Sequence, residues 1–263
     1  MTDTESGSVV ARGLNIATIL VLLVGLGVAL YVLASSLGVW MGLWDFRQGF
    51  GMLSNISTPA PWIIGVSAVV TITAFVGATV MSLGNSTRLA SAALIGTIAV
   101  TLAYYIPTSY RSAGAPGAAI HDISTDFVSP PAYVVIAPLR ADVPNSMVYG
   151  EDNDRTAEGL RQIQQEAYPD IAPQRFSDSV EQVFNRAVDA VDTMGWELVD
   201  ANLADGRIEA TDTTFWFRFK DDVVVYITSE GNETVVNARS LSRVGGSDFG
   251  KNATRLREFF ALL

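Results

Sequence analysis

Residues 13–40, GLNIATILVLLVGLGVALYVLASSLGVW, contain no charged side chain. A helix needs about 20 apolar residues to cross a bilayer, so this stretch is long enough to span a membrane. Two further charge-free stretches follow before Arg111, and Arg88 separates them. The sequence therefore predicts three transmembrane helices within residues 13–110, preceded by an N-terminal tail at residues 1–12.

The predicted spans contain no Asp, Glu, Lys, Arg or His. Ionisable groups within a membrane usually mark transport or proton-relay sites, so a transporter or pump is not indicated. Gly38 and Gly42 form a small-xxx-small pair of the kind that allows close helix contact in lipid. We interpret this pair as packing of helices within one chain, and a dimerisation motif is the alternative.

Acidic residues dominate the chain after Arg111. The whole chain carries a formal net charge of −10, and residues 1–111 contribute +1, which leaves −11 for the remainder. Nucleic acids and the anionic face of a bilayer both attract clusters of lysine and arginine and repel carboxylates, so neither is expected as a partner of this domain. The chain has no cysteine, which excludes disulfides, thiolate metal sites and a cysteine nucleophile.

A flexible linker rich in serine, alanine, glycine and proline is predicted at residues 111–119. A soluble domain is predicted to follow at residues 120–263. It begins irregularly, with several prolines and one candidate amphipathic helix at residues 156–167.

The second half of this domain has sharper signals. Apolar residues at helical spacing predict a helix that is capped by Ser177 or Asp178 and closed by Gly195. A last helix is predicted to start at Ser247 or Asp248. Between these helices lie five short segments rich in β-branched and aromatic residues, at hairpin spacing. They are residues 196–201, 207–212, 214–220, 223–229 and 234–241. The predicted fold class is α+β: a three-helix transmembrane region followed by an antiparallel β-meander sheet packed against helices.

The FWFRF segment (215–219) suggests a binding surface on this sheet. In a strand, its three phenylalanines would share one face, while Trp216 and Arg218 would point to the other. Together with Tyr226, these two residues could line an apolar and aromatic groove on the face away from the long helix. Core packing under the irregular segment is the alternative.

Five phrases of the soluble domain are distinctive: IHDISTD (120–126), AYPDI (167–171), GRIEAT (206–211), KDDVVV (220–225) and SLSRVGGSDFGKN (240–252). In this order they resemble the bacterial and plastid family known as domain of unknown function 1499. The resemblance covers the region from Ile120 to the C-terminus. It implies an envelope-facing or lumenal domain, and it supplies no reaction and no catalytic residue.

We expect a multi-pass protein of the bacterial inner (plasma) membrane, with its soluble domain outside the cytoplasm. Charge bias does not decide the orientation. With a cytoplasmic N-terminus, Arg12 and Arg88 would lie inside, and Arg47 and Arg111 would lie outside. The absence of cysteine agrees with an extracytoplasmic setting.

His121 is the only histidine of the chain, and Asp122 and Asp126 follow it closely. An imidazole beside carboxylates can act as a general base or bind a metal, so these three residues are the catalytic candidates. A zinc site needs about three protein ligands, and no metal site is predicted here. We favour the alternative that the three residues hold an irregular segment by bonding backbone N–H groups.

Arg243, Ser247 and Asp248 flank a Gly-Gly pair just before the last predicted helix. A glycine-rich turn at a helix N-terminus can hold a phosphate, so these residues are further binding candidates. Asp248 would repel an anion, so we favour capping of the helix by Ser247 or Asp248 and an ion pair for Arg243. Asp221 and Asp222 are predicted to form a solvated turn.

These observations predict a membrane-anchored binding or assembly module of the cell envelope that acts through its soluble domain. Its partner would be a protein or a lipid-like ligand, and no cofactor is predicted. The alternative is an envelope hydrolase or metal-dependent enzyme centred on His121, Asp122 and Asp126. A third class is a structural membrane subunit that works through its spans.

Overall fold

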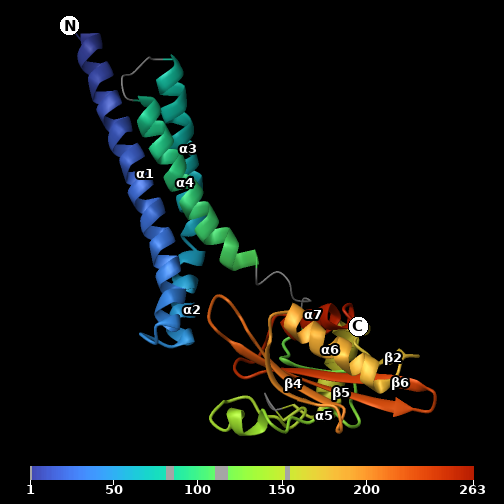
Figure 1. Ribbon diagram of the computed structural model, residues 1–263. Helices are drawn as coiled ribbons and strands as arrows, with labels where there is room; N and C mark the ends of the chain where they lie inside the picture. Colours follow the sequence, from blue (N-terminus) through green and yellow to red (C-terminus); the bar gives the residue numbers. More distant parts are fainter. Residues whose placement is uncertain (1, 81–85, 110–117, 152–154) are drawn as a thin grey trace. The chain divides into compact units, whose positions relative to one another are not determined.

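The computed structural model describes residues 2–80, 86–109, 118–151 and 155–263. The chain divides into two compact units, Met1–Tyr110 and Arg111–Leu263, which we call the helical unit and the C-terminal domain (Figure 1). Most of the predicted linker, residues 111–119, lies outside the described residues.

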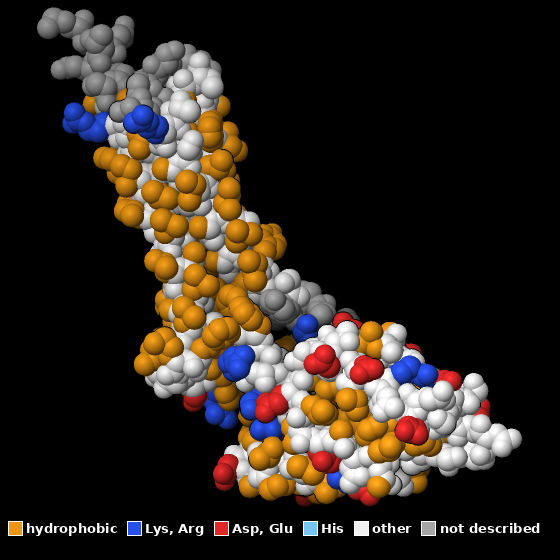
Figure 2. All heavy atoms as spheres, in the orientation of Figure 1, with side chains coloured by type: hydrophobic (Ala, Val, Ile, Leu, Met, Phe, Trp, Pro, Cys, Tyr) orange, Lys and Arg blue, Asp and Glu red, His pale blue; other side chains and the backbone are white. Residues whose placement is uncertain are grey.

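The helical unit contains three helices that are long and apolar enough to cross a membrane. Hydrophobic side chains cover its visible surface along most of its length (Figure 2). The prediction of three apolar helices is confirmed. They are α1 (Thr2–Trp40), α3 (Ala60–Val80) and α4 (Ser86–Ser109).

Helices α1 and α4 cross with their backbones in contact. A Cβ atom built on Gly25 would lie 2.0 Å from the carbonyl oxygen of Gly96, and one built on Gly96 would lie 2.4 Å from that of Val21. Small residues permit such close approach in lipid. Gly38 instead makes room for the ring of Trp44, because a Cβ atom on residue 38 would lie 2.0 Å from that ring.

A short helix, α2 (Phe46–Ser57), joins α1 to α3 and was not predicted. Its N-cap is Asp45, whose carboxylate accepts a hydrogen bond from the Gln48 N–H at 3.0 Å. The helix is amphipathic and packs against α1. Its sequence is rich in glycine and serine, which lower helix propensity and hide the pattern.

The C-terminal domain is built on a six-stranded sheet in the order β1-β6-β5-β4-β3, and β2 also pairs with β6. All pairings are antiparallel. The predicted meander is confirmed as β3 to β6, whereas the three-residue strands β1 and β2 were missed. The strands are β1 (Asp122–Ser124), β2 (Gln174–Phe176), β3 (Glu197–Asn202), β4 (Arg207–Thr213), β5 (Lys220–Glu230) and β6 (Glu233–Ser242).

Helices α6 (Val180–Thr193) and α7 (Lys251–Phe260) cover one face of the sheet (Figure 1). We call this the helix face. The buried apolar side chains of both helices join those of β4, β5 and β6 in the main core. Trp196 stacks on Phe259 there, with ring centroids 5.6 Å apart. A third helix, α5 (Ala157–Ala167), confirms the helix predicted in the irregular half.

Two helix starts differ from prediction. The N-cap of α6 is Ser179, which forms a reciprocal capping box with Gln182, rather than Ser177 or Asp178. Helix α7 begins at Lys251, later than the predicted start at Ser247 or Asp248. The carboxylate of Asp248 accepts bonds from the N–H groups of Gly250 and Asn252, both at 2.7 Å, and so caps the helix from upstream.

The predicted strand at residues 214–220 is wrong. Strands β4 and β5 already pair from Thr213 to Lys220, so residues 214–219 form the hairpin loop between them. Thr214 closes this loop by two hydrogen bonds with Phe219, at 2.8 and 2.9 Å. The phenylalanines do not share a face, because Phe215 is 65% exposed and Phe217 is buried.

Candidate functional site

The sheet face opposite the helices, which we call the outer face, is covered by residues 131–149. This segment includes a short 3-10 helix, Ala137–Arg140. Tyr133 and Ile136 are buried against Val224 and Leu241 of the sheet. The open groove that we predicted on this face is therefore filled by the chain itself.

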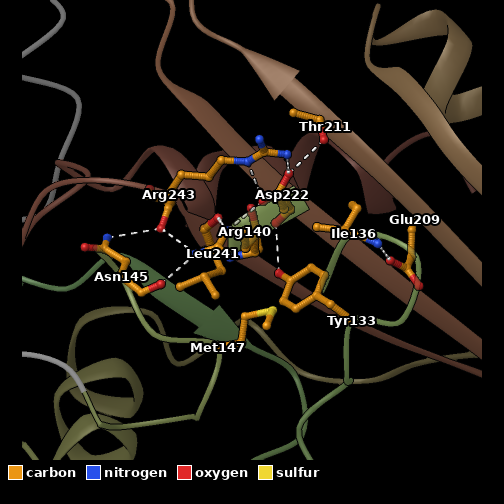
Figure 3. A network of polar contacts seen from close by, with 12 residues as sticks. Tyr133, Ile136, Arg140, Asn145, Met147, Glu209, Thr211, Asp222, Leu241 and Arg243 are labelled. Atoms are coloured by element: carbon orange, nitrogen blue, oxygen red, sulfur yellow. Dashed lines mark hydrogen bonds and ion pairs between the residues drawn. The ribbon is translucent and has the colours of Figure 1, made fainter. Parts of the chain in front are cut away.

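Asp222 of β5 is the centre of a buried polar network under this segment (Figure 3). Its carboxylate accepts hydrogen bonds from Arg140 Nη1 at 2.6 Å and from Arg243 Nε and Nη2 at 2.8 and 2.9 Å. Thr211 Oγ1 donates a further bond at 2.7 Å. One carboxylate thus holds two guanidinium groups, and Arg140 also donates to backbone carbonyls of Leu241, Ser242 and Asn145.

The predicted solvated turn at Asp221 and Asp222 is wrong, because both residues lie on β5 and are buried. Neighbours on a strand point to opposite faces, so the two aspartates meet different arginines. Asp221 lies on the helix face, where Arg255 of α7 binds it at 2.7 Å and binds Asp212 at 2.7 and 3.0 Å.

Glu209 of β4 is a second buried carboxylate on the outer face. It accepts three backbone N–H groups, from Val134 at 2.9 Å, Val135 at 3.0 Å and Ile136 at 2.7 Å. Arg207 Nε lies 3.0 Å from the same side chain. The carboxylate therefore fixes the start of the covering segment to the sheet, and its lone pairs are occupied by protein donors.

Asp122, one of the three catalytic candidates, is engaged in the same way. Arg239 of β6 binds it through two parallel bonds of 2.8 Å from Nε and Nη2. The Arg239 guanidinium also lies over the rings of Tyr133 and Tyr149, 5.6 Å from each centroid. Burial raises the pKa of both phenols above the ordinary value, so both are neutral at physiological pH.

His121 is buried, with 3% of its surface exposed. Its Nδ1 lies 3.2 Å from Asn145 Nδ2, which also donates to the carbonyls of Ser242 and Gly245 at 3.1 and 2.9 Å. Asp126 lies apart in a turn, where Oδ1 accepts the N–H groups of Val128 and Ser129 at 2.8 and 3.0 Å.

A small cleft adjoins His121 and Asp122. Its other lining residues are Gly150, Arg155 and Leu160, and its enclosed part has room for about one water molecule. Within the described ranges, no group of three or more His, Cys, Asp or Glu is placed to hold a metal ion. The structure thus brings two of the three catalytic candidates to one cleft that is much smaller than an ordinary substrate pocket.

The predicted binding residues do not form one surface. Trp216 and Arg218 belong to the loop at 214–219, whereas Tyr226 lies on the outer face and donates to the carbonyl of Ala132 at 3.1 Å. Arg243 is bound to Asp222, as described above.

The last two candidates lie in the turn before α7. Ser247 Oγ accepts the Phe249 N–H at 3.3 Å, and Asp248 caps the helix. Burial raises the pKa of Asp248 to about 6, in spite of the two N–H groups that it accepts. A buried carboxylate at this position would oppose an anion, so the Gly-Gly turn lacks the character of a phosphate site.

A family model described as Protein of unknown function (DUF1499) matches residues 122–263, which cover the sheet and its helices. No curated protein matches the chain.

Proposed function

Since the chain belongs to the DUF1499 family of proteins of unknown function, we propose a function from its own geometry: a membrane-anchored module that binds a partner. In this proposal α1, α3 and α4 cross the inner membrane of a bacterial cell envelope. The C-terminal domain acts outside the cytoplasm as a binding or assembly module. The length and apolar character of the three helices support the anchoring.

We favour binding over catalysis because the buried carboxylates are already bound by other groups of the protein. A general base needs a lone pair within reach of the proton that it removes. Asp122 is held by Arg239, Asp222 by two arginines, and Glu209 by three backbone N–H groups. These three carboxylates are therefore occupied in maintaining the fold.

The surface of the domain limits where a partner binds. Helices α6 and α7 cover one face of the sheet, and residues 131–149 cover the other. Binding is therefore assigned to loops and to the edge strand β3, and the partner is a protein or a lipid-like ligand. The acidic balance of the domain disfavours nucleic acid.

Native mass spectrometry of the full-length protein, extracted gently from its own membrane, tests this proposal. We expect a reproducible adduct, protein or lipid, that is lost when residues 118–263 are deleted. A bare full-length chain, or an adduct that survives the deletion, contradicts a binding role for the domain.

The cleft at His121 favours one alternative, an envelope hydrolase or metal-dependent enzyme that uses His121, Asp122 and Asp126. Replacing His121 with alanine distinguishes the two functions. Asn145→Ala is the control, because it removes the bond to Nδ1 together with the bonds to the Ser242 and Gly245 carbonyls and keeps the imidazole. If the contact only holds the segment, both variants lower the melting temperature. Loss of function at unchanged stability in His121→Ala alone supports the enzyme.

A further inference from the structure

The strand register shows at which end of the sheet the C-terminal domain is joined to the helical unit. Strand β1 runs antiparallel to β6 and begins opposite Leu241, near the end of β6. Just before β1, the carbonyl of His121 accepts the Ser242 N–H at 3.0 Å, and the carbonyl of Ile120 accepts the Asp248 N–H at 3.0 Å. The first residues of the domain therefore lie beside the end of β6, and we call this the tether end of the sheet.

The aromatic loop at residues 214–219 lies at the same end. Strand β5 begins at Lys220, directly after this loop, and Lys220 accepts the Arg243 N–H at 3.0 Å just beyond β6. The opposite end of the β5–β6 hairpin is the turn at Gly231 and Asn232 (Figure 1). With eleven residues at about 3.3 Å each, β5 separates this turn from the loop by about 35 Å.

The tether end exposes aromatic and basic side chains together. Phe215 is 65% exposed and Phe249 is 45% exposed. Arg218, in the same loop as Phe215, and Lys220, directly after that loop, are exposed as well. The domain as a whole is acidic, with a net charge near −11 after Arg111. Aromatic rings with neighbouring basic groups suit the boundary between hydrocarbon and lipid headgroups.

The backbone holds these loops in an uncommon conformation. Among the described residues, the non-glycine residues with positive φ are Arg218 at 57° and Phe249 at 55°. Residues other than glycine rarely adopt a positive φ, and those that do often occur at binding sites. Both belong to the tether end, where they present exposed side chains from turns.

The connection to the helical unit is short. Eight residues, 110–117, lie between the last residue of α4 and Ala118. At about 3.5 Å per residue, they span at most about 30 Å in any conformation. The tether end is therefore the part of the domain that follows α4 most closely along the chain.

We propose that the tether end rests on the lipid bilayer that holds α1, α3 and α4. Phe215 enters the interface between headgroups and hydrocarbon, and Arg218 and Lys220 contact the lipid phosphates. This inference rests on the proposed function, because it requires the helices to span a membrane. It identifies the lipid surface as one partner of the domain, and it leaves the turn at Asn232 and the edge strand β3 available for another partner.

The chain lacks cysteine, so single cysteines can be introduced without further change. The test uses the full-length chain in nanodiscs of phosphatidylcholine and phosphatidylglycerol, with an environment-sensitive nitrobenzoxadiazole label at Phe215→Cys. The matched control is the same label at Asn232→Cys, at the other end of β5. Nitroxide groups on the lipid acyl chains serve as the quencher.

We expect the label at residue 215 to emit at shorter wavelength and to be quenched several-fold more strongly than the label at residue 232. Equal quenching at the two positions overturns the proposal. A blue-shifted but unquenched label at residue 215 also overturns it, because protein then covers the loop. If the label at residue 215 shows no lipid contact but native mass spectrometry still detects an adduct, the proposed binding function remains supported and only the lipid contact is overturned.

A second variant addresses the possibility that the label itself draws the loop into lipid. The label is placed at Phe249→Cys, and Phe215 is either kept or replaced by serine. Quenching at residue 249 should fall in Phe215→Ser, whereas Val128→Ser, which removes another exposed apolar side chain, should leave it unchanged. Equal quenching in all three proteins overturns the role of Phe215.

Discussion

Replacing Asp222 with alanine removes the carboxylate on which Arg140, Arg243 and Thr211 converge. The side chain of Arg140 is fully buried, and it would keep only neutral backbone carbonyls as partners. Removing one member of a buried ion pair costs about 3–5 kcal/mol, because the remaining charge stays out of water. We expect a loss of unfolding free energy in this range, which is a large share of the total for a domain.

Urea unfolding of the full-length protein in detergent micelles measures this loss. The fluorescence of Trp196, which stacks on Phe259 in the core, should report on unfolding of the C-terminal domain. With an m value of about 2 kcal/mol/M, the midpoint of Asp222→Ala should fall by about 2 M.

The matched control is Glu233→Ala on the neighbouring strand β6. Glu233 forms an exposed ion pair with Arg175 at 3.1 Å, and such pairs contribute less than about 1 kcal/mol. A midpoint for Asp222→Ala that falls no further than that of Glu233→Ala would refute the reasoning, because the buried network would then contribute no more than a surface pair.

Three further predictions concern other parts of the chain. Burial raises the pKa of Asp248 to about 6, above the ordinary value of 3.8. Protonation of Asp248 therefore stabilises the folded domain below pH 4, by an amount on the order of 3 kcal/mol. This contribution is lost as the pH rises to about 6. Asp248→Asn should remove this part of the pH dependence, and urea midpoints of variant and parent that stay parallel from pH 4 to 7 contradict it. Gly96→Val should lower the thermal stability of the helical unit, because its Cβ would lie 2.4 Å from a carbonyl oxygen of α1, whereas Gly27→Val should not, because a Cβ there meets no atom within 4 Å. Tyr133→Phe removes a 2.9 Å bond to a carbonyl of β5 and should cost about 1 kcal/mol in urea unfolding.

Much of the architecture follows from local patterns that can be read along the chain. Charge-free stretches longer than 20 residues predict the three long helices, and alternating β-branched runs with Gly and Asp turns predict the meander. The three-residue strands β1 and β2 carry no such pattern, because tertiary pairing with β6 defines them. The FWFRF segment (215–219) has the two-residue period of a strand, but the β4–β5 register leaves it no partner.

The buried polar networks could be predicted less well from the sequence. The alternation rule correctly indicates that Asp221 and Asp222 point to opposite faces, but it does not identify their partners. Arg140 lies 82 residues from Asp222, at the end of a short 3-10 helix, and Arg255 lies on a later helix. Adjacent carboxylates in a sequence resemble a solvated turn until the distant arginines that neutralise them are known.

Hydrogen exchange of the full-length protein, measured by mass spectrometry in its native membrane and again in detergent micelles, tests most directly whether the C-terminal domain works by binding. A binding module predicts that exposed segments of this domain exchange more slowly in the native membrane, while its buried sheet exchanges equally in both. Identical exchange throughout residues 118–263 in the two settings would contradict the account.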